Sequence, residues 1–543
     1  MSFRGLWANT TFVYFLGLLT VGGAYIAILP PFEGFDENAH FSRIMEVASS
    51  SYNVLTHHSF IDKSVLDYSG PMPYSSGNPP YDQGKAYPSF FSNSLLVHDF
   101  VDQYSNKLFG HGFNPSDSPN WQVQHPPLYY LLMSPLFSQL SGFSFMTQLV
   151  MLRFVSFFIA IAGLFFGYLA YRNLANSRAQ RAKRLIGFVF YPIILPMFFL
   201  EFARIGNDSL CILIIGLIAY CLSLWLKNRD RFGKLFIIGT LLGTGLLTKA
   251  FFIPITLGLV FFLVIQHSDQ KVTKAGASIL LGNLGILLTP VIIIGGSWYL
   301  FKILIHGDIG LGGAATELVG GAGLSSGLVN NFHLFKFLRG LLVPLVSFSW
   351  AGSWSLVRFP LIIQLPIFFL SAWIFWTFIK TLKIDSLADY ESIALLMFIL
   401  LYLGLAAHVL ISMALTGLGA SGGWYLHILS PWLAPALGKA LHSILRDKFE
   451  RWILLALVIY SVVFQWLAIW SHMALFSGCA VKDDDKGFLF LSSDICLNNS
   501  FVIFDRLQII ASPFVSIFLF VLGFFLLLIA MLRTFKIETS DQA

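Results

Sequence analysis

Charged residues are scarce in this chain. Only 11% of its 543 residues are Asp, Glu, Lys or Arg, whereas 56% are hydrophobic. A water-soluble domain of this size needs far more polar surface, so the composition excludes one. Many apolar stretches exceed the roughly 18 residues that mark a membrane-spanning helix. The sequence therefore predicts an all-α polytopic membrane protein.

Cysteine is also scarce, with four residues in the chain. Cys211 and Cys221 lie within an apolar segment and are expected to be core residues. Cys479 and Cys496 flank the polar segment CAVKDDDKGFLFLSSDIC. Two interpretations stay open for this second pair. They form a disulfide, which would place that side of the membrane in an oxidising compartment, or they are free thiols.

The excess of basic over acidic residues is only six charges, and it is unevenly placed. Lys and Arg gather between apolar segments, at residues 172–184, 227–234, 271–274, 380–383 and 439–451. By the positive-inside rule these clusters mark the cytoplasmic side. The excess is therefore a topology signal and does not indicate nucleic-acid binding.

Twelve membrane spans fit this charge distribution, with both termini in the cytoplasm. They are predicted near residues 11–30, 148–171, 185–200, 208–226, 235–248, 250–265, 277–305, 359–380, 391–414, 425–442, 452–470 and 508–532. The first reads as a retained signal-anchor because it lacks a small-residue cleavage site. Counting residues 126–140 as a span would place the cluster at 172–184 outside, so a juxtamembrane or re-entrant helix is expected there. Residues 332–350 fit a span or a surface helix.

Three long segments are expected outside the cytoplasm: residues 31–125, 306–358 and 471–507. A loop of about 95 residues in a compact fold is usually functional, so the first is the expected place of the site. The second holds a glycine-rich run that lacks the strand and helix of a nucleotide cradle. With no internal repeat and no soluble domain, residues 1–543 are predicted to form one transmembrane domain.

The motif PPFEGFDENAH, residues 30–40, directly follows the first predicted span. If a helix begins near Asp36, then Asp36, Glu37 and His40 share one face just above the membrane. A carboxylate there can accept a proton from a nucleophile, and a low local dielectric raises its pKa toward a useful range. The alternative is that Asp36 merely caps an interfacial helix that runs to about Ala48.

Two further clusters lie at predicted membrane surfaces. QHPPLYYLL brings His125 to the end of the first long loop, where it either faces a site or anchors the interface with Tyr129 and Tyr130. SGGWYLHILSP places Trp424 and Tyr425 at the start of a later span. Aromatic residues at that depth are usually belt residues, but sugar rings also stack on them.

A short polar hairpin, EFARIGNDSL, separates two apolar spans on the outer side. Arg204, Asn207 and Asp208 are its candidate site residues, although Asn-Asp also fits plain turn chemistry. In LLTKAFF, a lone Lys249 between apolar runs suits phosphate binding as a compact cation. Lys249 would alternatively extend along the apolar surface to reach water.

The sequence predicts no metal site. The adjacent pair His57 and His58 is a poor ligand set, because neighbouring histidines rarely bind the same ion. No nucleotide-binding domain is expected either.

Together these segments resemble the GT-C superfamily of integral membrane glycosyltransferases. FDENAHF, residues 35–41, is similar to the acidic motif in the first outer loop of protein O-mannosyltransferases and aminoarabinose transferases. HPPLYYLL resembles the segment that leads into their second span, and LLTK resembles a stretch found in many of them. The order of motifs is most similar to a bacterial family of predicted GT-C membrane proteins. GGWYLHILSP fits more loosely, since relatives often carry Arg where Trp424 stands.

The resemblance implies transfer of a sugar from a polyprenyl-phosphate donor to a glycan, lipid or protein acceptor. The reaction would take place on the extracytoplasmic face of the cytoplasmic membrane, among membrane lipids. Asp36 would be the general base, with Glu37 as neighbour or substitute. His40 and His125 would orient the acceptor or the donor phosphate.

The resemblance also assigns cations to the departing lipid phosphate. Arg204 and Lys249 would neutralise it, joined by Arg339 or Arg358, because a phosphate leaving group needs fixed positive charge. It leaves open whether a divalent cation assists, which sugar is moved and whether transfer retains or inverts configuration.

Two other functions fit the same composition. A transporter would suit twelve spans, but transporters usually show two related halves and polar residues near the midplane. A lipid-linked glycan polymerase or ligase shares the substrates, but typically carries its long catalytic loop late in the chain. The early acidic motif therefore favours a glycosyltransferase.

Overall fold

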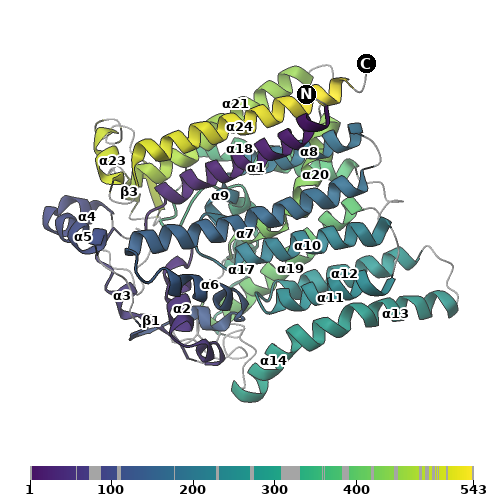
Figure 1. The fold of residues 1–543 in the computed structure, drawn as a ribbon, viewed down its shortest axis with the longest axis horizontal. Helices are drawn as coiled ribbons and strands as arrows, with labels where there is room; N and C mark the ends of the chain where they lie inside the picture. Colours follow the sequence, from purple (N-terminus) through teal and green to yellow (C-terminus); the bar gives the residue numbers. More distant parts are fainter. Residues whose placement is uncertain are drawn as a thin grey trace.

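A bundle of apolar helices makes up most of the computed structural model (Figure 1). The structure describes residues 3–56, 58–71, 87–106, 112–175, 178–227, 231–268, 274–306, 330–357, 359, 361–381, 390–417, 421–444, 450–475, 480–483, 488–491, 496, 498, 500–508 and 511–540. Four elements of the sequence analysis therefore lie outside the described residues: His57, the glycine-rich run at 307–327, Arg358 and Cys479.

Eight helical segments among the described residues are long and apolar enough to cross a membrane. They are α1 (Phe3–Ile28), α7 (Phe145–Leu174), α10 (Asp208–Lys227), the run α13 to η5 (Lys274–His306), α18 (Leu361–Thr381), α19 (Tyr390–Thr416), α21 (Glu450–Ala474) and α24 (Pro513–Ser540). The run contains α13 (Lys274–Pro290), η4 (Val291–Gly296), α14 (Ser297–Phe301) and η5 (Lys302–His306).

Four shorter helices occupy the remaining predicted spans. They are α8 (Arg178–Ile194), α11 (Arg231–Leu246), α12 (Phe252–Ser268) and α20 (Ser430–Ile444), the last preceded by η7 (Gly423–Leu429). The fold class is thus confirmed as a polytopic helical bundle. The predicted count of twelve spans is not confirmed, because these four helices are shorter than the roughly 20 residues that a full crossing needs.

The helices approach closely where small residues meet. Gly163 of α7 and Gly216 of α10 face each other, and a Cβ added to Gly216 would lie only 2.0 Å from the carbonyl oxygen of Gly163. In membranes such small residues let backbones pack tightly, which replaces the hydrophobic driving force that water supplies elsewhere. The α7–α10 pair consequently forms a rigid support next to the polar hairpin that begins α10.

The first long loop folds over the end of the bundle that lies away from the two chain termini (Figure 1). Its elements are α2 (Glu37–Ser49), η1 (Ser51–Leu55), β1 (Phe60–Asp62), α3 (Lys63–Leu66), α4 (Tyr87–Ser92), α5 (Ser94–Asn106), β2 (Pro115–Pro119) and η3 (Trp121–Gln124). Strands β1 and β2 pair antiparallel. This pairing returns the chain to α2, so the beginning and the end of the loop lie together.

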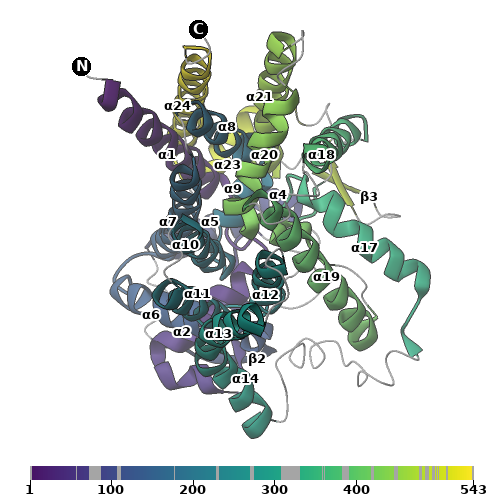
Figure 2. The same ribbon diagram turned by 90° about the vertical axis from the view of Figure 1, so that its right-hand side faces the viewer.

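Two segments that the sequence left between alternatives form short helices. Residues 126–140 contain α6 (Leu128–Gln139), which is too short to cross a membrane and packs against α2. Residues 332–350 contain α17 (Leu334–Phe348), which lies beside α19 (Figure 2). Neither adds a full span to the bundle.

The other connections are brief. Helix α9 (Met197–Phe202) forms the hairpin between α8 and α10. The third long loop contains the antiparallel hairpin of β3 (Ala480–Asp483) and β4 (Phe488–Leu491), followed by α23 (Ser500–Leu507). Cys496 in this loop is disulfide-bonded, whereas Cys211 and Cys221 are free, as expected for core residues. The pairing of Cys496 with Cys479 stays a prediction.

Candidate active site

Helix α2 begins where the sequence places it, directly after Asp36, and ends at Ser49. Asp36 itself has φ 56° and ψ 15°, a left-handed conformation that costs a non-glycine residue energy. Its side chain makes no capping hydrogen bond to the helix. The alternative that Asp36 serves only as a side-chain cap therefore finds no support in the geometry, and the strained backbone directs its carboxylate elsewhere.

The Asp36 carboxylate accepts a hydrogen bond from the Trp121 indole nitrogen, at 3.0 Å. The side chain keeps partial exposure, unlike the fully buried Glu37 next to it. Burial raises the pKa of Asp36, while the charges of Arg204 and Lys249 and the bond from Trp121 oppose that rise. Asp36 is thus a carboxylate without an ion-pair partner among the described residues, close to two cations.

Glu37 has a different environment. Its carboxylate oxygens accept hydrogen bonds from Nε and Nη2 of Arg153, at 2.7 and 2.6 Å. Oε1 also accepts a hydrogen bond from the backbone N–H of Ile205, at 3.1 Å. Arg153 donates as well to the carbonyl oxygens of Leu29 and Pro30, at the end of α1. Glu37 and Arg153 are therefore a buried pair that ties α1, α2 and α7 together.

His40 lies one turn further along α2 and is buried. Its Nδ1 is 2.9 Å from the hydroxyl of Tyr130, which in turn lies 3.2 Å from the side-chain oxygen of Gln122. Burial lowers the pKa of His40 well below its usual value, and the charge of Arg204 adds to this. A neutral His40 in a chain of hydrogen bonds orients its neighbours without adding charge.

The hairpin before α10 carries a compact charge cluster. Arg204 binds Glu201 through Nη2 at 2.6 Å and Asp208 at 3.3 Å, and its Nη1 donates to the carbonyl oxygen of Phe35 at 2.8 Å. Lys249 lies 2.8 and 2.9 Å from the two oxygens of Asp208. Since Phe35 directly precedes Asp36, this cluster touches the acidic motif itself. The sequence-predicted residues Asp36, Arg204, Asp208 and Lys249 thus meet in one place.

His125 joins the same place from the end of the first loop. The backbone N–H of Leu128 bonds to the carbonyl oxygen of Leu247, which holds HPPL against LLTK. Burial lowers the pKa of His125 to about 3, helped by the charge of Lys249. His125 is therefore neutral at physiological pH. Asn207, another predicted site residue, contacts the LLTK segment: its side-chain amide nitrogen lies 3.4 Å from the carbonyl oxygen of Thr248.

The aromatic pair of η7 closes another side of the site. The indole of Trp424 stacks on Phe35 with ring centres 3.9 Å apart, and the ring of Tyr425 lies 4.4 Å from the Lys249 ammonium. Sugar stacking on these rings stays a prediction. Arg339, in contrast, lies exposed on α17, and no described contact joins it to the site.

Sequence reasoning missed several residues that the site uses. Arg153 stands alone among apolar residues of α7, which is itself a signal, because a buried membrane charge needs a partner. Glu33, also in the acidic motif, accepts hydrogen bonds from the backbone N–H and the hydroxyl of Ser355 and so attaches residues 353–355 to the motif. Trp121 and Glu201 carried no signal of their own, since only the fold brings them to Asp36 and Arg204.

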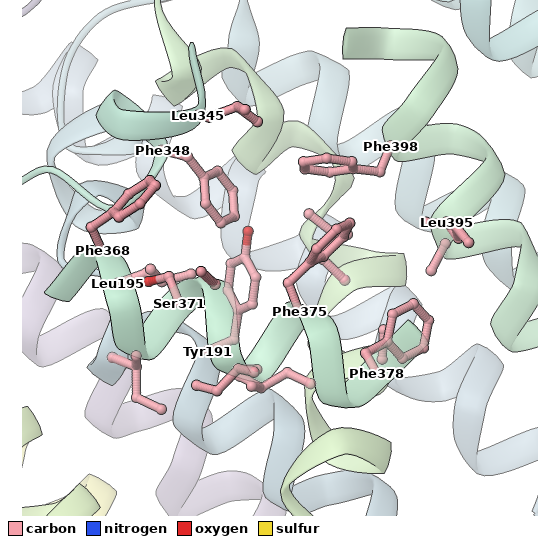
Figure 3. A pocket seen from close by; sticks show the side chains of 17 residues that line it. Tyr191, Leu195, Leu345, Phe348, Phe368, Ser371, Phe375, Phe378, Leu395 and Phe398 are labelled. Atoms are coloured by element: carbon pink, nitrogen blue, oxygen red, sulfur yellow. The ribbon is translucent and has the colours of Figure 1, made fainter. Parts of the chain in front are cut away.

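An apolar pocket opens inside the bundle near this site (Figure 3). Its volume is about 250 Å³, and its walls come from α8, α17, α18, α19 and α20. Tyr191 and Phe348 line the pocket, and both contact His427 of η7. The Tyr191 hydroxyl lies 3.0 Å from Nδ1 of His427, and the backbone carbonyl oxygen of Phe348 lies 2.9 Å from Nε2. Since His427 follows Trp424 and Tyr425 by two to three residues, η7 connects the pocket with the charged cluster.

Within the described part of the chain, no group of three or more His, Cys, Asp or Glu residues is arranged to hold a metal ion. Lys249 and Arg204 already occupy the carboxylates of the cluster. Lys249 and Arg204 are the cations that the described residues place in this cluster.

Comparison with known proteins agrees with the motifs. Residues 124–294 match the family model described as dolichyl-phosphate-mannose-protein mannosyltransferase. The matched part begins at Gln124 and includes Arg153, Arg204, Asp208 and Lys249, whereas the acidic motif precedes it. The match supports the class that the motifs predict, a membrane glycosyltransferase of GT-C type.

A solved structure is also similar: archaeal oligosaccharyltransferase AglB from Archaeoglobus fulgidus, in complex with an inhibitory peptide and a dolichol-phosphate. The identity is 13% and the TM-score 0.30, over 86% of this chain and 59% of that chain. The chain thus spans about three-fifths of the length of that structure. No curated protein matches the present chain.

Proposed function

We propose that this protein transfers a sugar from a polyprenyl-phosphate-linked donor to a hydroxyl-bearing acceptor at the extracytoplasmic face of the membrane. One observation carries the proposal: Asp36 is a carboxylate without an ion-pair partner among the described residues, beside Trp121, with Lys249 and Arg204 in electrostatic range. A base for the acceptor and cations for a leaving phosphate are what such a transfer needs.

In the proposed reaction, the acceptor hydroxyl gives its proton to the Asp36 carboxylate. The hydroxyl oxygen forms a bond to the anomeric carbon of the sugar as the bond between that carbon and the phosphate oxygen breaks. The bonding electron pair leaves with the lipid phosphate. Lys249, whose ammonium lies 2.8 Å from the Asp208 carboxylate, stabilises the negative charge of the leaving phosphate together with Arg204.

Asp36, and not Glu37, is the base in this proposal. The Glu37 carboxylate already receives two guanidinium nitrogens and a backbone N–H, so protonating it would break a buried ion pair. Asp36 loses only one indole hydrogen bond. His40 and His125, both neutral, position the acceptor or the donor phosphate through hydrogen bonds.

The apolar pocket supports a lipid-linked donor. A polyprenyl chain is a flexible hydrocarbon, and the pocket offers phenylalanine, leucine and alanine walls within the bundle. Its contact with η7 places it within reach of the charged cluster. A donor with its phosphate beside Lys249 would thus extend its tail toward Phe348 and Phe375.

The test is transfer by purified protein in vesicles that contain a set of polyprenyl-phosphate sugars. Asp36→Asn is expected to slow transfer by roughly 10²- to 10⁴-fold, the usual loss of a general base. Asp102→Asn, on the exposed face of α5 in the same loop, is the matched control and should keep full activity. Full activity of Asp36→Asn would overturn the proposal. Mass spectrometry of cell-surface glycans with and without the protein identifies the sugar and acceptor.

The proposed face of the membrane has a separate test. Leu95 on α5 is 73% exposed, so a Leu95→Cys substitution offers a reactive thiol in the first loop. A membrane-impermeant maleimide added to intact cells should label it. Labelling only after the cytoplasmic side is opened would place the site on the other face.

A further inference from the structure

His408 is an ionisable residue within an otherwise apolar membrane span. It belongs to α19, whose stretch Ser392–Leu415 is apolar enough to cross a membrane. Ionisable residues inside such spans are rare and usually face the interior of the bundle or a polar cavity. None of the motifs found in the sequence includes His408, so its place in the fold is informative.

Helix α19 runs antiparallel to α12. A Cβ on Gly258 of α12 would meet Met397, and a Cβ on Gly404 would lie 3.2 Å from Pro254. His408 is one helical turn beyond Gly404 and therefore on the same face. That turn brings it to the beginning of α12, which starts at Phe252, directly after the segment that carries Lys249.

The side chain of His408 does not belong to the packed core. Its neighbours Leu405 and Val409 are completely buried, whereas His408 is exposed and has no hydrogen-bond partner among the described residues. The charges of Lys249 and His408 both act on His125, and that of Lys249 acts on His408. Three groups from distant parts of the chain therefore share one site.

The cations of the cluster are already engaged with carboxylates, so a further hydrogen-bond donor to the phosphate would strengthen its binding. Lys249 is held by both oxygens of Asp208, and Arg204 by Glu201 and Asp208. Both cations already have carboxylate partners, and an incoming phosphate would share the cations with these partners. A phosphate that arrives beside Lys249 needs extra hydrogen-bond donors to replace its lost water.

We propose that His408 is a further substrate-binding residue, whose imidazole N–H donates a hydrogen bond to the phosphate of the lipid-linked donor beside Lys249. The inference rests on the proposed function and adds to it a ligand from the second half of the chain. It also gives α19 a role, because movement of this helix would move one phosphate contact.

Binding of farnesyl phosphate and of farnesol to the purified full-length protein in detergent tests the proposal. The two probes share an isoprenoid chain and differ in the phosphate. His408→Leu is expected to weaken farnesyl phosphate binding roughly tenfold, the usual effect of losing one hydrogen bond to a charged group, and to leave farnesol binding unchanged. His408→Gln, which keeps an N–H donor, should recover most of the loss. Leu403→Ala, on the exposed surface of α19, is the control for altered helix packing.

Each result decides between the proposals. If Lys249→Gln weakens farnesyl phosphate binding while His408→Leu does not, only the role of His408 is overturned. If His408→Leu weakens both probes equally, the residue acts through packing and the inference again fails. If the unsubstituted protein binds farnesyl phosphate no better than farnesol, the proposed phosphate site itself is wrong, and the inference falls with it.

Discussion

The carboxylate of Glu37 and the guanidinium of Arg153 form a forked ion pair in which both side chains are completely buried, 116 residues apart in the chain. The pair joins the first residue of α2 to the first third of α7. On the other side of Asp36, the carbonyl oxygen of Phe35 accepts a hydrogen bond from Arg204, so both neighbours of this left-handed residue are held in place. The two neighbouring acidic residues of the motif therefore lie in different environments, Glu37 in a buried ion pair and Asp36 beside Trp121.

The first prediction concerns this pair. Arg153→Met should lower stability by about 3–5 kcal/mol, because it leaves the buried Glu37 carboxylate without a partner. The double change Arg153→Met with Glu37→Gln should recover part of that loss. Thermal unfolding in detergent measures both. His98→Ala, which removes an exposed partner of Asp102, should leave the melting temperature nearly unchanged.

The same variants separate the two acidic residues. Glu37→Gln should reduce activity in proportion to the loss of folded protein. A Glu37→Gln protein with normal melting temperature and no transfer activity would instead make Glu37 the base.

The second prediction is a pH dependence. Asp36 must be ionised to accept a proton, so the transfer rate should fall as the pH drops through its raised pKa. The hydrogen bond from Trp121 stabilises the ionised form and lowers this pKa. Trp121→Phe should therefore raise the pKa of Asp36 further and move the acidic limb of the rate profile to higher pH, by up to about one unit.

Trp350→Phe is the matched control for this shift, because the Trp350 indole donates to the carbonyl oxygen of Val357 instead. Its profile should overlay that of the unsubstituted protein. A shift of the Trp121→Phe limb toward lower pH would contradict the assignment of the limb to Asp36.

The third prediction uses the apolar pocket. Ala372 of α18 lines it, so Ala372→Phe would fill part of the space that the polyprenyl chain is proposed to use. The KM for a long-chain donor should rise several-fold, while that for a donor with one or two isoprene units should change little. Leu365→Phe, at an exposed position of the same helix outside the pocket, controls for added bulk. Equal effects on both donors would place the chain elsewhere.

The fourth prediction concerns the cysteines. In unfolded, unreduced protein, a maleimide should label only Cys211 and Cys221, and reduction should release two further thiols. Peptide mapping should then find Cys479 linked to Cys496. Loss of this link, which closes a loop of about 18 residues, should cost roughly 3 kcal/mol in the chain-entropy account. A reduction-sensitive dimer on a gel would show that Cys496 pairs with another copy.

The sequence predicted the positions of the helices well, because long apolar runs between basic clusters leave few other arrangements in a membrane. It could not decide how many helices cross fully. Helices α8, α11, α12 and α20 are short, and their length depends on where neighbouring segments break. The start of α2 at Glu37 was also predictable, from the polar motif that follows the first apolar run.

What the sequence determined by itself is the class of protein and the chemical types at the site: a polytopic helical bundle with an acidic motif, HPPL, an Asn-Asp hairpin and a lone lysine. These are local patterns, and composition and spacing carry them. The tertiary structure decided which partners each group has. It paired Glu37 with Arg153 and Lys249 with Asp208, and left Asp36 with Trp121. These partners lie 41 to 116 residues apart in the chain, and only helix packing brings them together, so short-range sequence patterns do not predict the pairings.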